Sequence, residues 1–155
     1  MYIQGNGGHA SVVKDLLDVH PLEFDDTYAV IAVGDNEDRR KEAVRLAAFT
    51  FPALVHPSAT ISALASLGKG TVVMAGAVVQ AEAVIGEFVI LNTACTVDHG
   101  CRIGDFAHIA PGVHLCGNVE VGEGALVGVG SCATPGSKIE AWSIVKAGSV
   151  ICPTK

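Results

Sequence analysis

His99 and Gly117 are the pair of residues in this chain whose types and spacing best suit catalysis. A neutral imidazole can take a proton from a hydroxyl or ammonium group near neutral pH, which is the role of a general base. A backbone N–H beside it can hold the oxygen of a carbonyl under attack. The two residues are 18 positions apart. They can therefore act on one group only if the fold brings residues that are 18 positions apart next to each other.

A repeat of the required kind begins at Val55. Every sixth residue is aliphatic up to Ile151, and the residue two places before each of these is small or thin. Residues two apart on a strand point the same way, so both face inward, and three short strands close a triangular coil of 18 residues. We expect a mainly β fold, a left-handed parallel β-helix, over residues 53–155. An amphipathic helix, with a period of about 3.6, and a half-buried open sheet, with a period of about 2, do not fit.

The corners of this fold place the backbones of His99 and Gly117 one rung apart, about 4.8 Å. The prolines of the repeat share the hexad position of these two residues: Pro57, Pro111, Pro135 and Pro153. Because proline lacks an N–H, the fold does not need a backbone hydrogen-bond donor at that position. The Gly117 N–H is therefore expected to be free for a ligand. Two glycine series also recur every 18 residues, and we expect both to adopt a positive φ at corners: Gly68, Gly86, Gly104 and Gly122, and Gly76, Gly112, Gly130 and Gly148.

Residues 1–52 have a different pattern, that of a small α/β domain. A strand at 2–4 enters a glycine turn followed by helical spacing over 9–19, and a buried strand at 28–33 enters a second turn followed by a charged helix to about residue 49. A strand, a glycine turn and a helix N-terminus together can hold a phosphate through backbone N–H groups. The candidate substrate-binding residues of this reduced Rossmann-like domain are Gly5, Asn6, His9, Asp35 and Asn36.

Composition favours a cytoplasmic protein. No signal peptide is evident, and the longest apolar runs are far shorter than a membrane span. The net charge of −6 and the lack of a basic patch argue against a nucleic-acid partner. Five cysteines occur without a C-x-x-C motif, and Cys95 and Cys101 fall at inward positions, so we interpret them as free thiols in the core.

Four stretches and a Gly-Asn pair carry a family resemblance: residues 2–9 (YIQGNGGH), 30–36 (VIAVGDN) with Arg39, 55–59 (VHPSA), 97–112 (VDHGCRIGDFAHIAPG), and Gly117-Asn118. Together they resemble the hexapeptide-repeat sugar O-/N-acyltransferases of the sialic acid O-acetyltransferase and bacillosamine-pathway type. The likeness covers nearly the whole chain. The Gly-Gly-His start combined with Asp-His in the middle of the repeat is specific to this branch.

The resemblance implies an acetyl-CoA-dependent acetyltransferase that acts on an amino or hydroxyl group of a sugar, commonly a UDP-linked 4-amino-sugar. It implies a homotrimer with its active sites in the clefts between neighbouring β-helices, and no metal. His99 matches the general base, and Gly117 matches the glycine whose N–H binds the thioester carbonyl. Asn92 and His108 match positions at the site.

The chain departs from the family pattern in two places. Gly100 stands where relatives often carry a carboxylate, so Asp98 or a group of the next subunit is expected to orient the imidazole. The region before the second strand shrinks to about residues 20–26, and Asp25-Asp26 lie too close to that strand to be equated with the acidic pair that relatives have there.

Two alternatives stay open at this point. A zinc-dependent hydratase of the γ-carbonic-anhydrase type would need His108 and His114 to meet across a trimer interface, because they lie on different faces of one chain. Their spacing has five intervening residues where those enzymes have four. A non-catalytic β-helix binding surface would need a regular outward row, and the outward residues here are mixed. We expect the apolar outward row from Val72 to Ile90 to pack against sister subunits.

Overall fold

The structure is a computed structural model that describes residues 1–19 and 25–153. The expectations for residues 20–24 therefore lie outside the described residues. Strands β1 (Tyr2–Gln4) and β2 (Ala29–Ile31) pair in parallel and are followed by the helices α1 (Gly8–Asp18) and α2 (Asn36–Arg45). These four elements were predicted in type and order. Helix α2 ends before the expected residue 49, and Phe49 instead stacks on Tyr2 with ring centroids 5.9 Å apart.

The rest of the chain is a parallel β-solenoid of about five turns, built from two-residue strands in three sheets. We call the sheets face 1, face 2 and face 3. Face 1 contains β3 (Leu54–Val55), β6 (Val72–Val73), β9 (Ile90–Leu91), β12 (His108–Ile109), β15 (Leu126–Val127) and β18 (Ile144–Val145). Face 2 contains β4 (Thr60–Ile61), β7 (Val78–Val79), β10 (Thr96–Val97), β13 (His114–Leu115), β16 (Cys132–Ala133) and β19 (Val150–Ile151). Face 3 contains β5 (Ser66–Leu67), β8 (Val84–Ile85), β11 (Arg102–Ile103), β14 (Glu120–Val121) and β17 (Lys138–Ile139).

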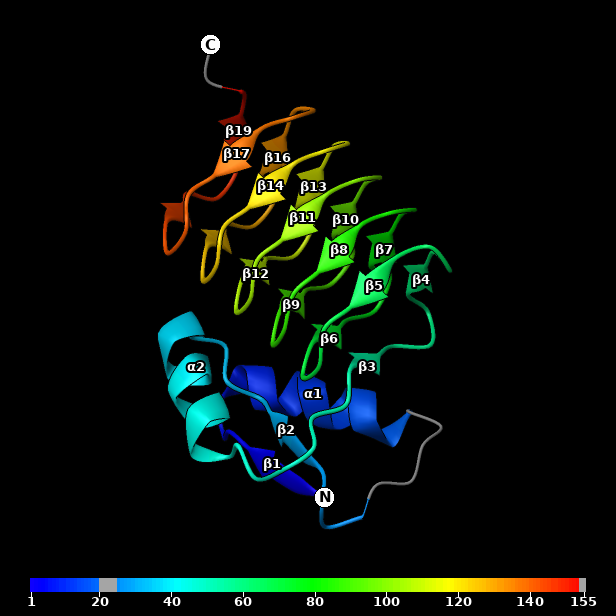
Figure 1. Cartoon of the computed structure of the whole chain (residues 1–155), viewed down its shortest axis with the longest axis vertical. Coiled ribbons are helices and arrows are strands. Elements are labelled where there is room, and N and C mark those ends of the chain that lie inside the picture. Colours follow the sequence, from blue (N-terminus) through cyan, green and yellow to red (C-terminus); the bar gives the residue numbers. More distant parts are fainter. Residues whose placement is uncertain (20–24, 154–155) are drawn as a thin grey trace.

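The 18-residue register is confirmed along every face. Thr96 pairs with His114 and Val97 with Leu115, and the neighbouring coils repeat this offset. The second residue of each strand points inward, and in the middle coils it is buried together with the small residue two places before it, as for Ile103 and Cys101. Figure 1 shows the coils stacked along the long axis, with the helices at one end and the C-terminus at the other.

The corners need glycine for two different reasons. Gly76, Gly112, Gly130 and Gly148 have φ between 64° and 70°, as predicted. The prediction of positive φ is wrong for Gly68, Gly86, Gly104 and Gly122, which are absent from the left-handed residues. There the next coil leaves no space for a side chain: a Cβ on Gly104 would lie 2.5 Å from the Glu123 nitrogen. Close approach of two coils, rather than backbone conformation, explains this series.

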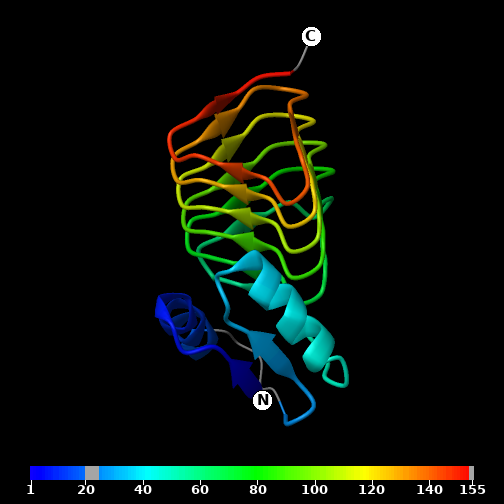
Figure 2. The same cartoon turned by 90° about the vertical axis from the view of Figure 1, so that its left-hand side faces the viewer.

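The N-terminal elements cover the first coils of face 1 (Figure 2). Val13 and Leu16 of α1 pack on the outward side chains of Leu54, Val72 and Ile90, all of which are buried. The expectation that the whole row from Val72 to Ile90 packs against sister subunits is therefore wrong for its two ends. The same chain already removes that apolar surface from water.

Helix α2 is fixed to the corner between face 3 and face 1 by hydrogen bonds to a row of backbone carbonyls. Arg39, only 1% exposed, donates from Nε to the Phe88 carbonyl at 2.8 Å and from Nη2 to the Phe106 carbonyl at 2.6 Å. Asn36 Nδ2 donates to the Gly124 carbonyl, on the next coil, at 2.9 Å. The stacked rings of Phe88 and Phe106, 5.3 Å apart, complete this contact. Three consecutive coils thus set the position of α2 and of the turn before it.

Candidate active site

His99 and Gly117 meet at the corner between face 2 and face 3. The His99 imidazole lies over Gly117: a Cβ placed on that glycine would be 2.5 Å from Cε1, 2.6 Å from Nε2 and 3.2 Å from Nδ1. His99 is exposed in the single chain, whereas Gly117 is buried. Glycine is therefore the residue that lets the imidazole rest against the backbone of the next coil.

The Gly117 N–H makes no hydrogen bond to any described residue, while the carbonyl of Gly117 accepts from Gly136 N–H at 3.0 Å. This agrees with the argument from the prolines that share its hexad position. An imidazole and an unused backbone donor thus lie side by side, which is the arrangement that attack on a carbonyl requires.

Within one chain the His99 imidazole has no partner among the described residues. The Asp98 carboxylate, expected as one possible orienting group, instead accepts the backbone N–H of His99 at 2.7 Å. Gly100 has φ 67° and carries no side chain that could serve.

A second group of polar residues lies around β12 on face 1, under the N-terminal turns. Asn92 Nδ2 donates to His108 Nε2 at 3.0 Å, so the His108 ring is neutral and accepts through that nitrogen. The His9 ring lies 6.4 Å from the His108 ring, centroid to centroid, and its Nε2 is buried without a hydrogen-bond partner. Three of the predicted substrate-binding residues therefore come together. We call them the His9–Asn92–His108 cluster.

The cluster is electrostatically unusual, because it contains two uncharged imidazoles beside a buried cation. Burial lowers the pKa of His108 to about 4, and the charges of Arg39 and His9 add to this, while a hydrogen bond with the Gly34 backbone opposes it. Burial likewise lowers the pKa of His9 to about 4, with Arg39 adding to the effect. Both rings are neutral at pH 7 and can exchange hydrogen bonds with sugar hydroxyl groups.

The glycine turn after β1 is shaped for backbone contacts. Gly5 has φ 136°, and a Cβ there would collide with the Ala32 carbonyl of the turn after β2. Gly7 caps α1 without a side-chain hydrogen bond, and Asn6 is exposed beside it, so the first N–H groups of α1 have no side-chain partner.

Asp35 and Asn36 are occupied within the chain. Asp35 caps α2 by accepting the Asp38 N–H at 2.9 Å, and Asn36 binds both Arg39 and the Gly124 carbonyl. The second turn could therefore bind a ligand through its backbone groups. Asp25 and Asp26 precede β2, at the strand end opposite the two turns, and they bind Thr27 and the N-terminal amine. They cannot serve a ligand held at the turns.

The two polar groups flank face 2. Asn92 lies at its corner with face 1, and His99 lies at its corner with face 3. The outward strand residues between these corners include no Asp, Glu, Lys or Arg among the described strands: Thr60, Val78, Thr96, His114, Cys132 and Val150. A hollow of about 230 Å³ on this face is lined by Asp98, His114 and Cys116 among others.

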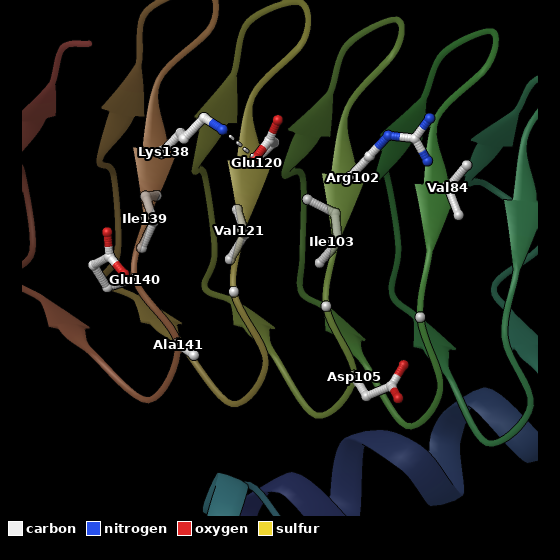
Figure 3. Close-up of a pocket in the computed structure, with 13 residues that line it drawn as sticks. Val84, Arg102, Ile103, Asp105, Glu120, Val121, Lys138, Ile139, Glu140 and Ala141 are labelled. Atoms are coloured by element: carbon white, nitrogen blue, oxygen red, sulfur yellow. Dashed lines mark ion pairs between the residues drawn. The ribbon is translucent and has the colours of Figure 1, made fainter. Parts of the chain in front are cut away.

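A larger hollow, with a volume of about 560 Å³, lies on face 3 (Figure 3). The charged residues on its strands alternate in sign from coil to coil, as Arg102, Glu120 and Lys138. Lys138 pairs with Glu120 at 2.8 Å, and Arg102 points toward Val84. Neither His99 nor Gly117 lines it. Because size alone does not make a site, the His99 corner remains the candidate active site.

Solved structures of similar chains show the family to which this chain belongs. The acetyltransferase domain of PglB from Neisseria gonorrhoeae is 36% identical, with a TM-score of 0.91, and the match covers 99% of this chain and 92% of that one. PerB from Caulobacter crescentus, solved with CoA and GDP-perosamine, is 34% identical, with a TM-score of 0.90 and coverage of 99% and 90%. The chain belongs to the hexapeptide-repeat sugar acetyltransferases. It is an acetyl-CoA-dependent acyltransferase of a sugar.

The other comparisons do not change this family assignment. WeeI from Acinetobacter baumannii is 18% identical with a TM-score of 0.76, which shows the fold alone. Neither a protein-family model nor a curated protein matches the chain. No helix among the described residues is long and apolar enough to cross a membrane.

The two histidines of the zinc alternative do not meet within this chain. No group of three or more His, Cys, Asp or Glu side chains among the described residues could hold a metal ion. His108 and His114 lie on faces 1 and 2, as predicted, and His114 Nδ1 instead contacts Thr96 Oγ1 at 2.9 Å.

Two residues at the site carried no assigned role in the sequence analysis, although the resemblance included both. Arg39 holds the Val33 and Gly34 carbonyls at 3.1 Å each, so it shapes the turn that covers His108. Asn118 has φ 58°, a conformation that glycine usually takes. The sequence repeat could have indicated this conformation, because Asn118 occupies the corner position that Gly100 and Gly136 occupy on the adjacent coils.

Proposed function

We propose that this chain transfers the acetyl group of acetyl-CoA to the amino group of a nucleotide-linked sugar, with His99 as general base. The observation that carries the proposal is the imidazole resting over Gly117, whose N–H is unused. The amino acceptor is favoured over a hydroxyl because PerB was solved with GDP-perosamine, and a second structure of similar identity, 35%, bears the name perosamine N-acetyltransferase.

In the proposed reaction the sugar amine attacks the thioester carbonyl carbon, and a C–N bond forms. His99 takes the proton that the nitrogen loses, through Nε2, the ring nitrogen nearer to Gly117. The Gly117 N–H binds the oxyanion of the tetrahedral intermediate. When the intermediate collapses, the C–S bond breaks and the imidazolium returns the proton to the sulfur of CoA.

The proposed sugar site is the His9–Asn92–His108 cluster, with residues 1–52 as a reduced Rossmann-like domain and residues 53–155 as the acetyl-transferring domain. The glycine turn and the N-terminus of α1 would hold the diphosphate, because their N–H groups lack side-chain partners and Arg39 adds positive charge nearby. Gly5, Asn6 and the backbone of Asp35 and Asn36 would border it.

We propose a homotrimer of left-handed coils in which face 2 is the subunit interface. Its uncharged outward row suits burial, and its edges carry the two halves of the site. Packing face 2 of one chain against its neighbour in a closed ring would bring the His99 corner of one subunit toward the partner's Asn92 corner. Five free thiols and the use of acetyl-CoA favour the cytoplasm.

The direct test measures release of CoA thiol with GDP-, UDP- and CMP-linked amino-sugars and their hydroxyl analogues. We expect turnover with an amino-sugar, and a loss in kcat of about 10²–10⁴ for His99→Ala with little change in acetyl-CoA binding. If His99→Ala keeps more than a tenth of the kcat, the general base is another residue.

The shared site has its own test, in which two inactive variants are mixed. His99→Ala chains and Asn92→Ala/His108→Ala chains should regain activity after subunit exchange, because some mixed interfaces pair an intact His99 with an intact cluster. Random exchange of equal amounts restores about a quarter of the sites. Exchanged trimers that stay inactive would show that each chain carries a complete site.

A further inference from the structure

The catalytic imidazole proposed above lacks a group that holds its orientation and tautomer. A general-base histidine usually donates a hydrogen bond from the ring nitrogen that does not react. Around His99 the Asp98 carboxylate accepts the backbone N–H, and Gly100 has no side chain. Glu82 is the charged residue at this corner on the preceding coil, and no hydrogen bond links it to the ring.

Asn118 is a polar residue at this corner, on the coil that follows the coil of His99. Its N–H donates to the His99 carbonyl at 2.9 Å, so the residue is attached to the backbone of His99. A side chain on Gly100 would collide with Asn118 Oδ1, which means that the amide folds back over Gly100, the residue next to His99. Asn118 also directly follows Gly117, over which the imidazole lies.

The same arrangement recurs at another corner with a packing role. Phe88 and Trp142 also have positive φ, 53° and 58°, and their rings lie over Gly70 and Gly124 of the preceding coils. Those side chains are aromatic and contact α2 residues or the core beside them. Asn118 is exposed, and its amide makes no hydrogen bond to a described residue. A left-handed conformation costs an asparagine little, but the free amide has no packing role that would account for it.

We infer that Asn118 is a positioning residue for His99. A rotation of the Asn118 amide away from Gly100 would let Oδ1 accept the Nδ1–H of the imidazole, which would leave Nε2 free as the base. This inference rests on the proposed function of His99. A neutral amide orients the ring without adding a negative charge beside it. This contact would fix the tautomer of His99 at a corner where Asp98 binds the backbone and Gly100 has no side chain.

Three variants at one position test this role. Asn118→Gly removes the amide and suits φ 58°, and it recreates the residue found at the same corner in Gly100 and Gly136. We expect an unchanged thermal midpoint and an unchanged KM for acetyl-CoA, with kcat lowered about 10- to 100-fold, as for other groups that orient a functional imidazole. Asn118→Asp should keep most of the kcat at high pH but move the acidic limb of the pH–kcat profile upward by about one unit, because a carboxylate favours the protonated ring. Asn118→Ser, too short to reach the ring, should behave as Asn118→Gly.

Glu82→Gly is the matched control, because Glu82 has φ 63° at the same corner one coil earlier. It should leave kcat and the pH profile unchanged. An unchanged kcat in Asn118→Gly, or a pH profile that stays in place in Asn118→Asp, would overturn the positioning role while His99→Ala remains inactive. An active His99→Ala enzyme would instead refute the proposed base, so the two failures are distinguishable.

Discussion

Replacing Gly117 by alanine should disable the enzyme by moving His99 rather than by damaging the fold. The new methyl group would lie 2.5 Å from the imidazole Cε1 and 2.6 Å from Nε2. Ordinary carbon contacts begin at about 3.5 Å, so the ring must move by about 1 Å. A misplacement of that size costs about 10² in rate, equivalent to about 2.7 kcal/mol of transition-state stabilisation.

The fold has reason to tolerate this change. Gly117 is not among the residues with positive φ, so alanine meets no backbone strain, and the exposed imidazole can turn toward solvent. We expect a thermal midpoint within about 2 °C of the parent. Because alanine keeps the N–H, the lost activity reports the displaced base alone.

Thiol release at saturating substrate, combined with a double variant, is the assay. Gly117→Ala/His99→Ala should turn over as slowly as His99→Ala, because a displaced base and an absent base are equivalent. Gly117→Pro would crowd the ring in the same way and also remove the N–H, so it should fall about another tenfold or more below Gly117→Ala. A folded Gly117→Ala enzyme that keeps a third of the parent kcat would show that the imidazole does not work from its position over Gly117.

Three further outcomes concern the cluster, the α2 contact and the zinc alternative. Since His9 and His108 have pKa values of about 4 in the fold against an ordinary 6.5, the unfolded chain binds more protons between those values. Stability present above pH 6.5 should therefore be lost as the pH falls toward 4, with a slope of up to about two protons that His9→Gln lowers to about one, measured by chemical unfolding. Arg39→Met should cost several kcal/mol, about 1–3 for each of the Phe88 and Phe106 carbonyls left without its donor, and Arg39→Lys should recover only part of it; an unchanged midpoint in a urea titration would contradict this. Dialysis against a chelator should leave kcat unchanged, and a loss restored by zinc would revive the hydratase alternative.

The hexad pattern predicted much of the solenoid because its information is local. A strand alternates inside and outside whatever surrounds it, so Val97 and Cys101 could be assigned to the core, and the 18-residue offset brought His99 to Gly117. The pattern could not say what covers an outward residue. Val72 and Ile90 are outward and apolar whether a neighbouring chain or α1 lies over them, and the structure places α1 there.

The turns were predicted less completely than the strands, for a related reason. Asp35 and Asn36 are residue types that suit both phosphate binding and helix capping, and only the position of α2 against Gly124 shows that their side chains are already used. The gathering of His9 with His108 required a contact between segments about a hundred residues apart, and no local period encodes that. The family resemblance placed both residues at a site, but it did not place them side by side.

The three corner carbonyls held by α2 also limit how this chain can change in length. They stand at Phe88, Phe106 and Gly124, one coil apart, so an insertion or deletion between them that is not a whole coil would turn the later corners away from Arg39 and Asn36. Whole coils inserted between them would separate the carbonyls beyond the reach of one helix. Coils added or removed after Trp142, which Arg40 of α2 contacts, would leave the contacts of α2 and of the His99 corner in place. Length variation among related chains should therefore gather in the later coils and come in steps of one full turn, 18 residues.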